Sequence, residues 1–224
     1  MIEKCKYFND HKTACVLMID DLVPAAVSID GLVCPANDWG FAMDNPESLY
    51  AYLNNHLFAK FPEIKGTIFL PIQSYNHIPN NKGYTIFKRS IDQQYLEFIR
   101  RIIPRFEMAF HGVDHSWIDQ GCQKVVLEFA NLDNVVGSDL LRITKEFQEN
   151  TKLQFHGGKF PGYRYNQNAL TFIKNMQAEW WAFDSHMLNN VSKQNDLSWK
   201  PNMDVVAIPS NVSGDIFKSY NQGG

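Results

Sequence analysis

Six short apolar runs, each of strand length, recur along the chain and are separated by polar or helical stretches. They cover residues 14–19, 66–70, 106–110, 153–155, 180–183 and 205–208. Most of these runs are continuously apolar, as expected for parallel strands whose two faces are both buried. The pattern therefore predicts a parallel sheet rather than an antiparallel sheet with one face in water.

Four stretches between these runs repeat apolar residues at helical spacing. They contain residues 49–57, 95–103, 136–147 and 167–176. Asn45-Pro46-Glu47 supplies a cap, a proline at the first helical position and an acid in the first turn. Alternating strands and helices predict an α/β fold, here a single domain over residues 1–224. Because an eight-unit barrel usually needs about 250 residues, we expect a distorted or incomplete (β/α) barrel.

Composition narrows the class of protein without identifying it. Apolar residues make up 45% and charged residues 20% of the chain, which is ordinary for a globular protein. The net charge of -3 argues against a nucleic-acid partner, and no apolar stretch reaches the ~20 residues of a membrane span. The first residues lack a hydrophobic signal core and the four cysteines are scattered, so we expect a cytoplasmic protein.

Two polar segments, far apart in the sequence, each follow an apolar run. Asp20 and Asp21 close the first run, and His111 and His115 follow the third. If the two runs are neighbouring parallel strands, these side chains meet at one edge of the sheet, where they offer ligands for a divalent metal and a spare base. Histidines at this spacing can also converge from a single helical turn. Taken singly, the first segment is more simply a solvated strand end and the second a pair of surface loop histidines. Together the two segments favour a metal-dependent hydrolase.

These segments resemble the motifs of the polysaccharide deacetylases, carbohydrate esterase family 4, which have the NodB-homology fold. The family motifs are an apolar strand ending in Asp-Asp, a His-(Ser/Thr)-x-x-His segment, an Arg-x-Pro turn rich in glycine, and an aromatic strand ending in an acid. The similar segments, in the family's order, are residues 19–22, 111–115, 158–164 and 180–185. Gly112 replaces the hydroxyl residue of the second motif. The resemblance implies a barrel of the glycoside hydrolase/deacetylase type.

By position, the resemblance implies that Asp21, His111 and His115 bind a divalent metal and that Asp20 is the general base. One carboxylate and two imidazoles suit Zn²⁺ best, and Co²⁺, Ni²⁺ or Mn²⁺ are also compatible. Three protein ligands leave positions open for water and a substrate oxygen, as in catalytic metal sites.

Four further residues are candidates for substrate binding. A backbone N–H of Gly162 or Tyr163 is expected to contact the oxyanion formed during attack. Trp117 offers an aromatic face to a sugar ring at the rim of the site, with core packing as the alternative. Asp184 ends the strand that resembles the family's fourth motif.

Two departures from the family pattern affect the catalytic groups. The family's arginine, which orients the base carboxylate, is replaced by Lys159, unless Arg164 substitutes for it or contacts an acidic group on the substrate. The family's Leu-x-His motif, whose histidine is the acid, has no counterpart after residue 208. We therefore expect either that the last strand is missing or that another group, with His186 as the candidate, supplies the proton.

The predicted function is that of a metal-dependent deacetylase, which removes an N-acyl group, preferentially N-acetyl, from an amino sugar or a surface-polysaccharide precursor. The expected cytoplasmic location favours a soluble precursor over an exported polymer. One alternative is an amidase on the same fold that acts on a cyclic imide or ureide. A second alternative is a carbohydrate-binding homologue without turnover.

Overall fold

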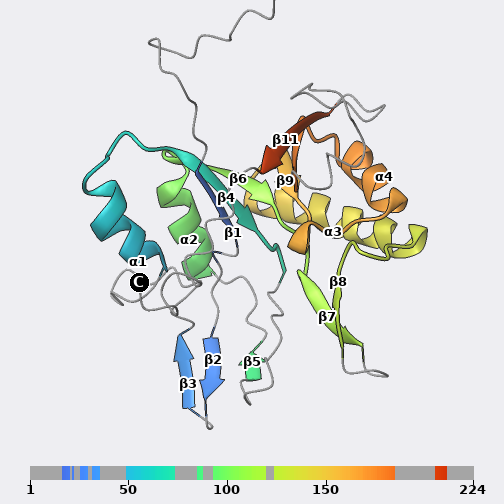
Figure 1. Cartoon of the computed structure of the whole chain (residues 1–224), viewed down its shortest axis with the longest axis horizontal. Coiled ribbons are helices and arrows are strands. Elements are labelled where there is room, and N and C mark those ends of the chain that lie inside the picture. The colour runs from blue at the N-terminus through green and yellow to red at the C-terminus, as the bar shows by residue number, and fades with distance from the viewer. Residues whose placement is uncertain are drawn as a thin grey trace, which may run out of the picture.

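The computed structural model describes residues 17–20, 22, 26–29, 32–35, 49–73, 85–87, 93–119, 124–184 and 205–210. Its main element is a parallel sheet in which the strands follow the order β1-β4-β6-β9-β10-β11 (Figure 1). These strands are β1 (Leu17–Asp20), β4 (Gly66–Leu70), β6 (Phe106–Phe110), β9 (Gly157–Lys159), β10 (Trp180–Asp184) and β11 (Val206–Ser210). Every neighbouring pair is parallel, so the predicted parallel α/β architecture is confirmed.

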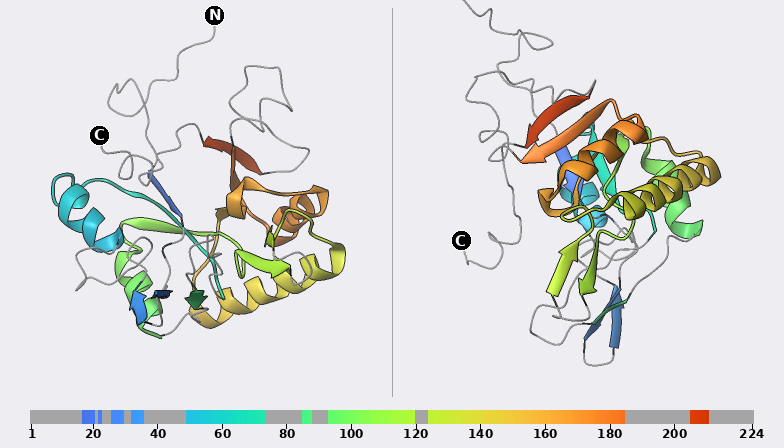
Figure 2. Two further views of the ribbon diagram at one scale, coloured as in Figure 1. Left: turned by 60° about the horizontal axis from the view of Figure 1, so that its bottom comes forward. Right: turned by 90° about the vertical axis from the view of Figure 1, so that its right-hand side faces the viewer.

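The six strands lie in the sheet in the same order as in the chain. A doubly wound sheet reverses its strand order and carries helices on both faces. Sequential order with right-handed crossovers instead leaves the helices on one face, as in a barrel. The sheet is curled but open, because β1 and β11 are each paired along one side only within the described residues (Figure 2). The fold is therefore α/β with a half-barrel sheet, in agreement with the expected incomplete barrel.

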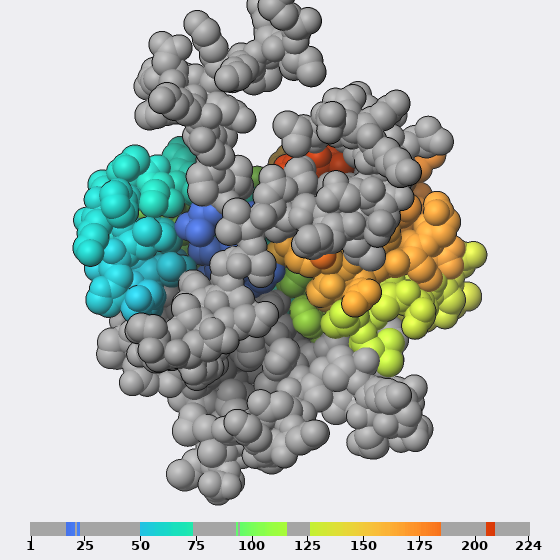
Figure 3. All heavy atoms as spheres, viewed as in Figure 1, coloured from blue at the N-terminus to red at the C-terminus, as the bar shows by residue number. Residues whose placement is uncertain are grey.

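The four predicted helices are present in the connections between the strands. They are α1 (Leu49–Leu53), which continues as the π-helix η2 (Asn54–Phe58), α2 (Gln93–Ile102), α3 (Asn134–Thr151) and α4 (Gln167–Met176). The side chains of Asp133 and Asn166 cap the N-termini of α3 and α4, where each accepts a hydrogen bond from a backbone N–H group in the first turn. In the space-filling view, α1 and α4 lie on opposite sides of the molecule (Figure 3). Among the described helices, none combines the length and the apolar character that crossing a membrane requires.

The two faces of the sheet have different environments. Ile68, Phe110 and Trp181 point to the face covered by the helices and belong to the large core cluster. Successive strand residues point to opposite faces, and their neighbours Phe69, Ala109 and Ala182 form a separate small cluster on the other face. The helix-free face therefore corresponds to the inside of the half-barrel.

The strand predicted at residues 153–155 is wrong in position: the chain forms its strand at β9, four residues later. Leu153 and Phe155 are buried but lie outside any strand. The backbone of β9 lies so close to the next strand that only glycine fits there: a Cβ added at Gly157 would lie 2.1 Å from the Trp180 ring. A periodicity of apolar residues cannot reveal such a strand.

Additional antiparallel pieces extend from the carboxyl ends of the first strands. They are β2 (Ala26–Ile29), β3 (Leu32–Pro35) and β5 (Thr85–Phe87), which form one sheet, and the hairpin β7 (Ser116–Asp119) with β8 (Lys124–Leu127). In Figure 1 both pieces lie below the parallel sheet. Because they follow β1, β4 and β6 in the chain, they lie beyond the edge at which ligand sites of such sheets form.

Candidate active site

The carboxyl ends of the parallel strands carry most of the residues singled out in the sequence. Asp20 is the last residue of β1, His111 follows β6, Lys159 ends β9 and Asp184 ends β10. Since all these strands are parallel, the four residues lie along one edge of the sheet. Asp184 is partly buried there, two strands from β6.

Lys159 connects the first strand of the sheet with the fourth. Its side chain is only 3% exposed, and its ammonium group pairs with Oδ2 of Asp20. The ammonium also lies 4.6 Å from the centre of the Phe69 ring and 4.9 Å from that of Tyr163. A buried cation needs such compensation, and the carboxylate and the two ring faces supply it. Asp20 Oδ1 is buried and has no hydrogen-bond partner among the described residues.

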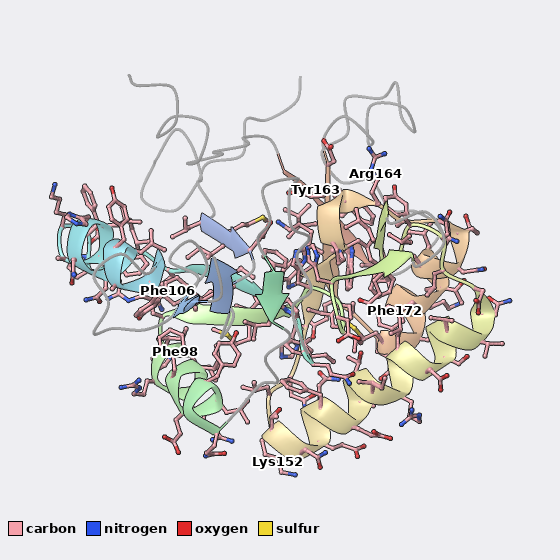
Figure 4. All side chains as sticks on the ribbon, turned by 90° about the horizontal axis from the view of Figure 1, so that it is seen from below. Phe98, Phe106, Lys152, Tyr163, Arg164 and Phe172 are labelled. Carbon is pink, nitrogen blue, oxygen red and sulfur yellow. The ribbon has the colours of Figure 1, made fainter. Side chains whose placement is uncertain are left out.

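Arg164 does not take the place of Lys159. The Arg164 side chain is exposed, and within the described residues it has no ion-pair partner. Figure 4 shows Tyr163 and Arg164 extending from their turn, away from Phe98 and from α3. Of the two basic residues considered for the contact with Asp20, the lysine therefore makes it.

The imidazole of His111 is held in one tautomer by the backbone of β9. Its Nδ1 lies 2.9 Å from the carbonyl oxygen of Lys159. A carbonyl oxygen only accepts hydrogen bonds, so Nδ1 carries a proton, and in the neutral imidazole Nε2 has the lone pair. Histidines that bind metals through one nitrogen are typically oriented in this way through the other. His111 therefore fits a metal ligand, with Nε2 as the donor atom.

His111 and His115 face each other across the loop of residues 111–115, which we call the histidine loop. Their ring centroids are 5.2 Å apart. Two imidazoles bound to one tetrahedral ion through bonds of ~2.0–2.1 Å have their centroids about 5 Å apart, so the observed separation fits a shared ion. The expectation of a single helical turn is wrong, because Gly112 has φ +95° and His115 has φ +62°.

Glu128, which was not predicted as a site residue, supports the backbone of the histidine loop. It is 2% exposed, and its carboxylate accepts hydrogen bonds from the backbone N–H groups of Val113 (2.8 Å) and Asp114 (3.1 Å). Burial raises the pKa of Glu128 to about 7, although the two backbone hydrogen bonds lower it. The available signal in the sequence was an acid enclosed by apolar neighbours at the end of residues 125–129.

The turn after β9 holds the two residues proposed for contact with the oxyanion. Gly162 and Tyr163 both have φ +55°, in the left-handed region. The backbone N–H of Tyr163 donates to the carbonyl oxygen of Phe160 at 2.9 Å, so that donor is already used. The hydroxyl of Tyr163 lies 3.5 Å from the Lys159 ammonium. Of the two N–H groups, that of Gly162 remains the candidate for the oxyanion.

Three of the predicted site residues have side chains that the structure does not describe. Asp21 and His186 are outside the described residues, and the side chain of Trp117 is as well. Among the described residues, no group of three His, Cys, Asp or Glu side chains is arranged to hold a metal ion. The set of three ligands that includes Asp21 therefore stays a prediction.

Comparisons with known proteins add only remote similarities. No protein-family model matches the sequence, and no curated protein matches it. Among solved structures, 4-alpha-glucanotransferase from Thermococcus litoralis is 12% identical, with a TM-score of 0.49 over 87% of this chain and 27% of that chain. A de-N-acetylase from Aggregatibacter actinomycetemcomitans is also 12% identical, with a TM-score of 0.43 over 77% of this chain and 71% of that chain. This chain thus spans about a quarter of the length of the glucanotransferase.

Proposed function

We propose that this protein is a metal-dependent deacetylase that hydrolyses an N-acyl group, preferentially N-acetyl, on an amino sugar or a surface-polysaccharide precursor. One observation carries the proposal: Lys159 pairs with Asp20 through its side chain and holds His111 through its backbone carbonyl. A carboxylate base, its cation and an imidazole whose Nε2 is the proposed donor atom to the metal are thereby joined at one edge of the sheet.

The metal in this proposal is held by Asp21, His111 and His115. Two features of the described residues fit it, namely the tautomer of His111 and the 5.2 Å separation of the two imidazole rings. A bound Zn²⁺ polarises an amide carbonyl and lowers the pKa of a coordinated water to about 7. Neutral imidazoles and one carboxylate suit Zn²⁺, and Co²⁺, Ni²⁺ and Mn²⁺ remain compatible.

Asp20 acts in this proposal as the general base. Its Oδ2 is paired with the Lys159 ammonium, and its buried Oδ1 has no hydrogen-bond partner among the described residues. Oδ1 is therefore available to accept the proton of the attacking water while the water oxygen bonds to the acyl carbon. The N–H of Gly162 is the donor proposed for the oxygen that becomes negatively charged.

Breaking the C–N bond requires a proton for the leaving amine. His186 is proposed as this acid, because it follows the strand that ends in Asp184. The products are then a carboxylic acid and an amino sugar. Asp20 releases the proton of the attacking water to solvent and His186 takes one up from solvent, so that both return to their initial protonation states.

The experiment measures acetate release from N-acetylated amino sugars by the purified, zinc-loaded protein, with and without a chelator. We expect release to stop with the chelator and in the Asp21→Ala and His111→Ala variants, which should also lose bound zinc. His156→Ala is the matched control, since His156 is exposed and pairs with Glu179 through a surface contact. Acetate release that persists in all three conditions would contradict the proposal.

A carbohydrate-binding protein without turnover is the second candidate, favoured by the lysine at the position of the family's arginine. Lysine gives a single contact in place of the bidentate fork that arginine offers to a carboxylate. Calorimetry with the same sugars distinguishes the two candidates, because a pure binder shows saturable heat and no acetate after long incubation. Cyclic imides and ureides in the substrate panel test the remaining alternative, an amidase on the same fold.

A further inference from the structure

The histidine loop has a backbone conformation that needs support. Gly112 has φ +95°, and His115, which is not a glycine, has φ +62°. The left-handed region is unfavourable for a residue with a Cβ and persists only where surrounding contacts impose it. The position of the His115 ring relative to His111 depends on this conformation, because the ring follows its own backbone.

Glu128 makes contacts along most of this loop. Its carboxylate oxygens accept the N–H groups of Val113 and Asp114, one each, and its own N–H donates to the carbonyl oxygen of His115 at 3.2 Å. The carboxylate also occupies the space beside Gly112, where an added Cβ would lie 2.6 Å from Oε2. The side chain therefore fixes two consecutive peptide groups between the two histidines.

The hairpin β7–β8 explains how Glu128 reaches the loop. His115 directly precedes β7 and Glu128 directly follows β8, and the register pairs Ser116 with Leu127. The backbone hydrogen bond between Glu128 and His115 thus continues the antiparallel pairing by one residue, at the base of the hairpin. This pairing brings Glu128, which follows His115 by 13 positions in the sequence, next to the backbone between the two histidines.

We propose that Glu128 is a positioning residue that holds His115 in its left-handed conformation, facing His111. Its three hydrogen bonds go to the backbone of the loop, so it acts through the loop rather than on substrate. The consequence for metal binding rests on the proposed function, whereas the consequence for the loop itself does not.

The experiment compares the full-length wild type with Glu128→Gln by two measurements. Glutamine keeps the shape but turns one acceptor into an NH₂ donor that faces a backbone N–H. We expect the amide hydrogens of Val113 and Asp114 to exchange at least about tenfold faster, with exchange in α3 unchanged. We also expect Zn²⁺ affinity, measured by competition with a chromophoric chelator, to fall about 10–100-fold, as for other residues that orient metal ligands.

Two control variants separate positioning from a general loss of stability. Glu146→Gln makes the same chemical change at an exposed position of α3 and should leave both measurements unchanged. Ile99→Ala removes a buried side chain of α2 and should lower stability while leaving the two loop amides and Zn²⁺ affinity close to wild type. If Glu128→Gln does not fold, Glu128→Asp is measured in its place, with the same expectations.

The possible outcomes decide separately between this proposal and the proposed function. Unchanged exchange at Val113 and Asp114 in Glu128→Gln overturns the positioning role, as does a loss of Zn²⁺ affinity no greater than in Ile99→Ala. If the wild type binds none of Zn²⁺, Co²⁺, Ni²⁺ and Mn²⁺, the proposed function fails. Accelerated exchange confined to the two loop amides would in that case still support the role of Glu128.

Discussion

His111 and Lys159 are joined through the backbone of β9, since Nδ1 of the imidazole donates to the Lys159 carbonyl oxygen at 2.9 Å. The same lysine extends its side chain to Asp20. One residue therefore sets the tautomer of an imidazole with its main chain and the charge environment of a carboxylate with its side chain. A substitution of Lys159 therefore removes the side-chain contact with Asp20 but keeps the main-chain contact with His111.

Lys159→Met tests this separation. The carbonyl remains, so His111 should keep its tautomer and Zn²⁺ affinity should stay within about twofold of wild type. Asp20 loses its cation, and we expect the rate of acetate release to fall by about a hundredfold, at the lower end of what a positioned base contributes. Steady-state kinetics and zinc titration give the two numbers.

Lys145→Met is the matched control, because Lys145 is an exposed lysine on α3. It should leave both numbers unchanged. A Lys159→Met variant that loses its zinc, or that retains its full rate, would contradict the assigned division between main chain and side chain.

Asp20→Asn removes the proposed base without changing its shape. We expect the rate of acetate release to fall by about 10²–10⁴-fold, while bound zinc remains near wild type because Asp20 is not a proposed ligand. Elemental analysis and a single-turnover assay measure the two effects. Loss of zinc in this variant would instead make Asp20 a ligand, and full activity would remove it from the mechanism.

The elements of the parallel sheet were largely predictable because they depend on apolar periodicity. The pattern predicted β4 and α4 at their observed bounds. It failed at β9, where Gly157 and Gly158 make room for the rings of Trp180 and Trp181. Strand positions that must be glycine do not show up in the periodicity of apolar residues.

The site was predictable to the extent that it follows from strand ends. Asp20 and His111 could be placed at one edge from their positions after apolar runs, because parallel strands share their carboxyl end. Glu128 could not be placed, since its role depends on the return of the β7–β8 hairpin to His115. The left-handed conformation of His115 was also missed, because only a minority of histidines adopt it and the residue type alone does not predict it.

Gly112→Ser restores the residue type found in the resembled family and should nevertheless be harmful here. Gly112 has φ +95°, and a Cβ would lie 2.6 Å from Glu128 Oε2. We expect the free energy of unfolding to fall by about 1–3 kcal/mol, as for other residues forced into such conformations. Urea denaturation of the metal-free protein measures it.

Gly137→Ala provides the contrast for this prediction. Gly137 lies inside α3, where alanine is favoured over glycine by about 1 kcal/mol, and its added Cβ would lie 3.2 Å from Leu132. We expect its stability to stay within about 1 kcal/mol of wild type. If Gly112→Ser is as well tolerated as Gly137→Ala, the histidine loop is not constrained as described.

The raised pKa of Glu128 predicts a specific dependence of stability on pH. Burial raises this pKa from 4.5 to about 7, with the charge of Asp114 adding to the rise and His111 and the two backbone N–H groups opposing it. Between these pH values the folded protein keeps a proton that the unfolded chain has already lost. The free energy of unfolding should therefore decrease as pH rises from 4.5 to 7, by up to about 3 kcal/mol from this group.

Glu128→Gln isolates this contribution because glutamine does not titrate. The free energy of unfolding of the metal-free wild type, minus that of the variant, should decrease as pH rises through the same interval and level off above pH 7. Urea denaturation at closely spaced pH values measures the difference, and titrations common to both proteins cancel. A difference that is constant or increases with pH would mean that the Glu128 carboxylate is not destabilised by its burial, and that its backbone hydrogen bonds outweigh the loss of water.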